Sequence, residues 1–240
     1  MRENSTSRLL SSAWAIHLET ALIIALSAAF ALGVEHSFEP DHVVAVSTIV
    51  AQSKAITKSL LTGWLWGLGH TAVLLIAGIL VLLFRVQFPP GISSSFELIV
   101  GVMLVILGIW TLSKLRRGKF HFHVHIHDGR THAHIHSHAE GPSREHAHLP
   151  FSVGMVHGLA GSGALVILAM STMTGVIEGV FFMVFFGAGL IFAMSLIASA
   201  LSVPSVLGGK LSSLIRPVFS AGAGSLSVAL GIFVIFGFFI

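Results

Sequence analysis

The sequence predicts an all-α polytopic membrane protein with six transmembrane helices, arranged as two inverted three-helix repeats. Of its 240 residues, 54% are hydrophobic and only 10% are charged, whereas soluble domains carry about 25% charged residues. The apolar residues fall in runs long enough to cross a bilayer, for which a straight helix needs about 20 residues. Short motifs also recur at a near-constant spacing, which indicates a repeat.

The first predicted span is interrupted. Residues 1–19 are expected to form a polar or interfacial segment, and the span covers residues 20–50, which is longer than one crossing requires. Pro40 lies inside it and has no N–H to donate to the carbonyl of His36, so a break is expected there. The alternative is a separate helix over residues 8–29, which would make seven spans.

Five further spans follow, at residues 60–84, 96–112, 151–173, 176–201 and 214–240. The long hydrophilic segment 114–150 divides the chain into a first repeat at 20–113 and a second at 151–240.

The repeat rests on three matches. Gly33–His36 matches Gly154–His157 at an offset of 121, and Gly67–Gly69 matches Gly187–Gly189 at an offset of 120. The sequence from Glu97 also resembles that from Ser225, at an offset of 128. Because each half has three spans, an odd number, the second half enters the membrane inverted relative to the first, as in many secondary transporters.

The basic residues predict an orientation in the plasma membrane. The loops on one side of the six-span arrangement hold ten of the 13 Lys and Arg residues: Lys54, Lys58, Lys114, Arg116, Arg117, Lys119, Arg130, Arg144, Lys210 and Arg216. The positive-inside rule places this side in the cytoplasm. Since these residues lie in connecting loops, they indicate topology and no nucleic-acid partner.

An ionisable cluster lies within the first span. His36, Asp41 and His42 occupy membrane depth, where a charged group costs roughly 2.5–3.5 kcal/mol and normally marks an ion or substrate path. On a regular helix Asp41 would lie about 140° and His42 about 240° from His36, so an unwound turn is needed to bring them together. A metal-ion site is predicted. The alternative is a hydrogen-bonded polar group that only fixes the break.

Two further histidines are candidate ligands. The repeat brings His70 and His157 toward the same interface as the first cluster. The alternative for each is a buried histidine hydrogen-bonded across helices. The second half has Ser162 and Gly163 where the first has Asp41 and His42, so the site is expected to be asymmetric.

The chemistry available to the site is limited to imidazole and carboxylate. The chain has no cysteine and 15 histidines, which favours Ni, Co, Zn, Cu(II) or Fe over Cu(I). No H-E-x-x-H motif is present, and the small residues at 158–163 are typical of close helix packing, so no enzyme is predicted.

A second histidine cluster lies in the loop. His121, His123, His125, His127, His132, His134, His136 and His138 alternate with other residues on either side of Asp128-Gly129. This pattern predicts a metal-collecting β-hairpin that pairs His125 with His132 and His123 with His134. The alternative is a disordered His-rich linker.

The motifs together resemble a known family. G-V-E-H-S-F-E-P-D-H resembles the H-x4-D-H signature of the nickel/cobalt transporter superfamily. W-G-L-G-H-T, F-E-L-I-V-G-V-M-L, the His-rich loop and V-H-G-L-A-G-S-G are similar to its UreH-like branch. The resemblance implies that His36, Asp41 and His42 bind the transported ion, with His70 and His157 as additional motif histidines. Classical importers of the family have eight spans and D-A-D-H, unlike this chain.

The expected function is transport of Ni²⁺ or Co²⁺ as substrate across the bilayer. By resemblance, the expected partner is a metallochaperone or urease or hydrogenase maturation machinery. The alternatives are transport of Zn²⁺ or Fe²⁺, and a metal-storage or sensing membrane protein through which no ion crosses.

Overall fold

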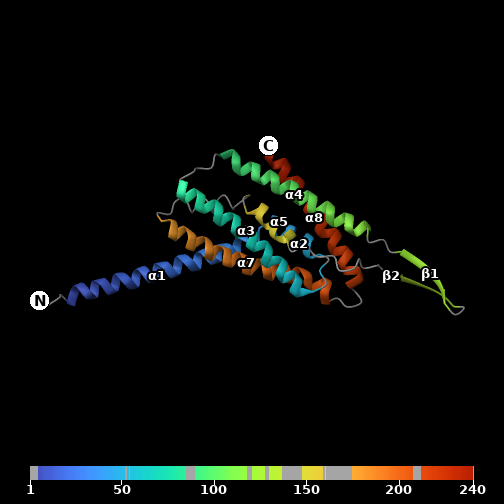
Figure 1. The fold of residues 1–240 in the computed structure, drawn as a ribbon, viewed down its shortest axis with the longest axis horizontal. Coiled ribbons are helices and arrows are strands. Elements are labelled where there is room, and N and C mark those ends of the chain that lie inside the picture. The colour runs from blue at the N-terminus through green and yellow to red at the C-terminus, as the bar shows by residue number, and fades with distance from the viewer. Residues whose placement is uncertain are drawn as a thin grey trace.

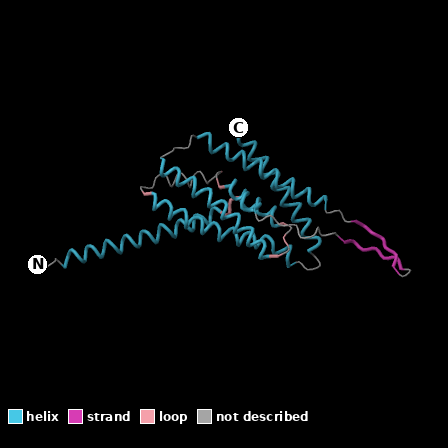
Figure 2. The backbone as a smooth tube through the Cα atoms, viewed as in Figure 1, coloured by secondary structure: helices cyan, strands magenta, loops and turns pink. Residues whose placement is uncertain are grey.

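A helical bundle with a projecting two-stranded hairpin forms the computed structural model of the protein (Figures 1 and 2). It describes residues 5–51, 53, 55–84, 90–117, 121–127, 130–136, 148–158, 160, 175–207 and 212–239. The helices are α1 (Ser5–His36), α2 (Pro40–Val50), α3 (Ile56–Phe84), α4 (Pro90–Arg117), α5 (His148–His157), α7 (Val176–Leu207) and α8 (Ser212–Phe239). The strands are β1 (His121–His127) and β2 (Arg130–His136).

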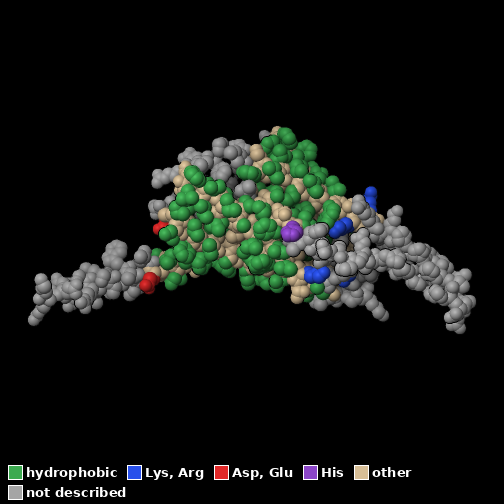
Figure 3. Space-filling view, viewed as in Figure 1, with side chains coloured by type: hydrophobic (Ala, Val, Ile, Leu, Met, Phe, Trp, Pro, Cys, Tyr) green, Lys and Arg blue, Asp and Glu red, His purple; other side chains and the backbone are tan. Residues whose placement is uncertain are grey.

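The helices are those of a polytopic membrane protein. Within the described residues, five are long and apolar enough to span a bilayer, namely α1, α3, α4, α7 and α8, and α2 is a shorter apolar helix. Large apolar side chains cover the outside of the bundle, where they would face lipid (Figure 3). The predicted fold class is confirmed at this level. The second part of the span expected at 151–173 lies outside the described residues.

The predicted break in the first span is confirmed. α1 ends at His36 and α2 begins with Pro40 as its first residue, a position where the missing N–H is not needed. The carbonyl of His36 instead accepts a hydrogen bond from the backbone N–H of Glu39, at 3.1 Å. α1 runs without interruption from Ser5, so no turn separates residues 8–29 from the first span.

A second break, meaning here that a helix ends inside the span expected at 151–173, occurs at His157 and was not predicted by the sequence. Residues 161–174 lie outside the described part of the chain. α5 ends there, and the backbone N–H of Ala160 donates to the carbonyl of His157 at 3.1 Å. Ala160 follows Glu39 by 121 residues, so this bond repeats the bond from Glu39 to His36. Both breaks therefore leave a histidine at the C-terminal end of a helix within the bundle.

The helix crossings recur at the same spacing. A Cβ atom on Gly33 of α1 would clash with the carbonyl oxygen of Phe186 in α7, and one on Gly154 of α5 would clash with the carbonyl oxygen of Trp66 in α3. Gly154 follows Gly33 by 121 residues and Phe186 follows Trp66 by 120. The α1–α7 and α3–α5 crossings are therefore equivalent, and only glycine permits either backbone approach.

The contact between α4 and α8 indicates a different offset from that of the third sequence match. Gly101 faces the carbonyl oxygen of Gly231 and Gly108 faces that of Gly224. These two contacts are equivalent if residues in α8 follow their counterparts in α4 by 123 residues. This spacing differs by five residues from the offset of 128 between Glu97 and Ser225, which stays a prediction.

The loop histidines lie in a hairpin, as one of the two alternatives predicted. β1 and β2 pair antiparallel, and the register places His125 opposite His132, His123 opposite His134 and His121 opposite His136. The predicted register is confirmed. The hairpin extends beyond the end of the bundle (Figure 1), and the visible Lys and Arg side chains gather at this same end (Figure 3).

Candidate metal centre

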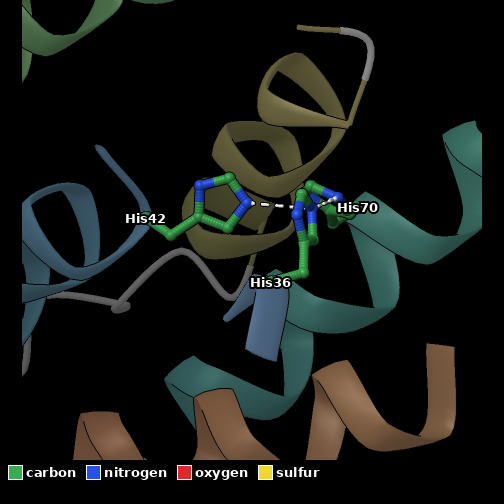
Figure 4. A group of neighbouring side chains, drawn as sticks. All are labelled: His36, His42 and His70. Atoms are coloured by element: carbon green, nitrogen blue, oxygen red, sulfur yellow. Dashed lines mark hydrogen bonds between the residues drawn. The ribbon is translucent and has the colours of Figure 1, made fainter. Parts of the chain in front are cut away.

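Three helices bring three imidazole rings together near the middle of the bundle. His36 is the last residue of α1, His42 lies in the first turn of α2, and His70 lies halfway along α3. Nε2 of His36 is 3.0 Å from Nε2 of His70 and 3.2 Å from Nε2 of His42. The rings point toward one another across the break between α1 and α2 (Figure 4).

A second group shares one of these rings. Asp41, His42 and His157 each offer a ligand atom within 4.8 Å of the others. Oδ1 of Asp41 is 2.9 Å from Nδ1 of His42, and its Oδ2 is 4.0 Å from Nε2 of His157. The structure therefore brings all five residues expected at the site into two adjacent groups that meet at His42.

Oxygen acceptors fix the tautomers of three of the four histidines. Nδ1 of His157 donates to the carbonyl oxygen of Val153 at 3.2 Å, and Nδ1 of His42 donates to the carboxylate of Asp41. Nδ1 of His36 donates to Oε1 of Glu39 at 3.1 Å. A neutral imidazole has one N–H, so each of these rings turns the lone pair of its Nε2 into the cluster.

This arrangement places acceptors against each other. Nε2 of His36 and Nε2 of His42 lie 3.2 Å apart, and in neutral rings whose protons are on Nδ1 both of these atoms are acceptors. Within the part of the chain that the structure describes, the buried Nδ1 of His70 and Nε2 of His157 have no hydrogen-bond partner. A cation between the Nε2 atoms of His36 and His42 would separate these facing acceptors, and one beside Asp41 would pair Nε2 of His157.

Two aromatic side chains form the walls of the cluster. The centroid of the Trp66 ring lies 4.9 Å from that of His42, 5.1 Å from His70 and 5.4 Å from His157. The Phe186 ring lies 5.4 Å from His36. Trp66 and Phe186 are fully buried and exclude water from the imidazoles. Trp66 was missing from the expected site. The available sequence signal was its position one helical turn before His70, which puts the two side chains on the same face of α3.

The cluster is open on its carboxylate side. His36, His42, His70 and His157 are at most 6% exposed. The side chains of Glu39 and Asp41 remain 30% and 23% exposed. The two carboxylates are therefore the part of the cluster most accessible to solvent. Glu39 was missing from the expected site, although its place between His36 and Asp41 in the broken turn was the available signal.

Comparison with known proteins agrees with this architecture. The chain is 36% identical over 215 residues to the urease accessory protein UreH of Bacillus sp. (strain TB-90), covering 88% of this chain and 90% of the relative. No family model matches the chain, and no solved structure matches it. With this identity over nearly the whole length of both proteins, the chain belongs to the UreH-like branch of the nickel/cobalt transporter superfamily.

Proposed function

We propose that this protein carries Ni²⁺ or Co²⁺ across the plasma membrane along a path lined by His36, Asp41, His42, His70 and His157. The relative is a urease accessory protein, which supports nickel as the substrate. The partner that we propose is a metallochaperone or the urease or hydrogenase maturation machinery on the cytoplasmic side.

The separations between the imidazole nitrogens carry the proposal. Two nitrogens that each lie about 2.0–2.1 Å from one ion are ~3–3.4 Å apart in octahedral or tetrahedral geometry. Nε2 of His36 lies 3.0 and 3.2 Å from the equivalent atoms of His70 and His42. These two separations are those of ligands that share one cation, and the ligand atoms of all three rings lie within 4.8 Å of one another. Asp41 and His157, which share His42, offer a second position for the ion.

The two broken helices support a transport path rather than storage. In many transporters, interrupted helices at the interface of inverted repeats hold the ion near the bilayer midplane. Here the breaks after His36 and His157 repeat the same hydrogen bond, and α3 runs opposite to α7 (Figure 1). We infer two inverted halves whose interface holds the ion.

Flux across a membrane tests the function. The purified protein in proteoliposomes should admit Ni²⁺ or Co²⁺ to a trapped metal-sensitive dye, and protein-free vesicles should not. A storage or sensing protein would bind the metal without dye response. Parallel assays with Zn²⁺ and Fe²⁺ decide between the metals, and faster flux of either would contradict the nickel or cobalt assignment.

A topology prediction follows from the basic residues. We expect Lys54→Cys and Lys210→Cys to be protected in intact cells from an impermeant thiol reagent, because positive-inside places them in the cytoplasm. Glu19→Cys, in α1, is the matched probe for the opposite end and should be labelled. The chain has no native cysteine to obscure the result. Labelling of both lysine positions from outside would reverse the orientation.

The hairpin is proposed to collect metal without forming the path. Deleting residues 120–147 leaves α4 and α5 whole and removes the eight histidines of the expected collecting surface. We expect most of the bound metal to be lost, measured by equilibrium dialysis, while transport continues with a changed metal dependence. Replacing the same eight histidines by serine controls for the change in length. Loss of all transport in a correctly inserted deletion variant would show that the loop is essential.

A further inference from the structure

His36 and His157 are equivalent residues with different orientations. Each ends the helix that precedes a break, and they are 121 residues apart. Nδ1 of His157 donates to the carbonyl of Val153, four residues earlier on its own helix. Nδ1 of His36 donates instead to the carboxylate of Glu39, three residues later in the broken turn.

The residue at position 39 accounts for the difference. The carbonyl of Leu32, 121 residues before Val153, is the corresponding acceptor on α1, four residues before His36. The second half has Ala160 at the position of Glu39, so His157 has no carboxylate in its turn and uses its own helix. A histidine at the end of either helix thus has the backbone carbonyl four residues earlier available as an acceptor. For His36, the carboxylate of Glu39 takes the place of that carbonyl.

We propose that Glu39 is a positioning residue that turns the His36 ring so that its Nε2 faces the transported ion; this rests on the proposed function. With Nδ1 held by Oε1 of Glu39, Nε2 of His36 lies 3.0 Å from His70 and 3.2 Å from His42. Outer partners of this type fix the tautomer and ring orientation of ligating histidines.

The contacts of Glu39 favour positioning over direct ligation. Its Oε1 accepts the hydrogen bond from His36. Glu39 is also outside both groups whose ligand atoms all lie within 4.8 Å of one another, namely His36, His42 and His70, and Asp41, His42 and His157. The second-half geometry also describes the expected state without Glu39: the His36 ring would bond to the Leu32 carbonyl. The protein would remain folded and keep the His36 ligand, but the ring would face the cluster for only part of the time, which weakens ion binding without abolishing it.

A crossed pair of variants separates geometry from charge. Glu39→Gln keeps the length of the side chain and an oxygen acceptor but removes the charge, whereas Glu39→Asp keeps the charge and shortens the side chain by one methylene. Both are assayed with Glu39→Ala in the full chain in proteoliposomes, as KM and maximal rate for Co²⁺ flux. Glu35→Ala is the control, because Glu35 is an exposed carboxylate one turn earlier on α1.

Positioning predicts that Glu39→Ala and Glu39→Asp raise KM by about 10–100-fold, the usual cost of losing an outer partner. Glu39→Gln should change KM by less than about 10-fold, and Glu35→Ala should match the wild type. A wild-type KM in Glu39→Ala would overturn the assignment. So would a wild-type KM in Glu39→Asp together with a raised KM in Glu39→Gln. Either result would leave the proposed function unaffected. Absence of both Co²⁺ and Ni²⁺ flux in the wild type would overturn the function and the assignment with it; if only Ni²⁺ crosses, the same KM comparison is made with Ni²⁺.

Discussion

Alanine at His36, Asp41 or His42 is expected to abolish metal transport while the protein remains in the membrane. Each replacement removes a donor from the set that is proposed to bind the ion. The Nε2 atoms of His36 and His42 are 3.2 Å apart, and Oδ1 of Asp41 is 2.9 Å from Nδ1 of His42. Ligands that act on one ion fail as a unit, so no single loss should leave partial flux. The measurement is Ni²⁺ or Co²⁺ flux in proteoliposomes containing equal amounts of each variant.

The control for this series is another histidine. His148→Ala changes an exposed side chain at the start of α5, away from the cluster, and should retain wild-type flux. Size-exclusion profiles in detergent should show that the variants are folded. Near-normal flux in two of the three alanine variants would remove the centre from the transport path and favour a polar group that only stabilises the break.

The first half of the site was predictable because its determinants are local. Pro40 removes a specific backbone donor, so the interruption after His36 follows from covalent structure alone. Once the helix is broken, the short chain between His36 and His42 limits how far apart the rings can lie. The hairpin register was predictable for the same reason, since a two-residue turn fixes which histidines face each other.

The rest of the site depends on packing that one sequence does not specify. The break after His157 has no proline, and its recurrence was visible only once the turn at Ala160 could be compared with that at Glu39. The buried contacts of Trp66 depend on how α3 meets α5, which the spacing of its own motif does not reveal. Apolar residues are interchangeable in helices such as α4 and α8, so the glycine contacts favour an offset of 123 over the 128 of the sequence match.

Gly33→Ala and Gly154→Ala are expected to cause the largest losses of stability. A Cβ on either would overlap a backbone carbonyl, that of Phe186 or Trp66, and a backbone cannot move aside as a flexible side chain can. Adding even one methyl group to a close-packed contact typically costs about 1–3 kcal/mol. Since each glycine lies three residues before His36 or His157, the forced separation would also displace that histidine.

The matched controls are glycines in open surroundings. Gly222 and Gly237 also lie in a helix, α8, but a Cβ on either meets no atom within 4 Å. Because alanine is the better helix former by about 0.8–1.0 kcal/mol, Gly222→Ala and Gly237→Ala should keep or raise stability. The measurement is the fraction of soluble monodisperse protein after heating in detergent, together with flux. The contrary result would be that Gly33→Ala and Gly154→Ala lose monodisperse protein at the same temperature as the controls and transport metal at the wild-type rate. The close crossings of α1 with α7 and of α3 with α5 would then not hold the histidines in place.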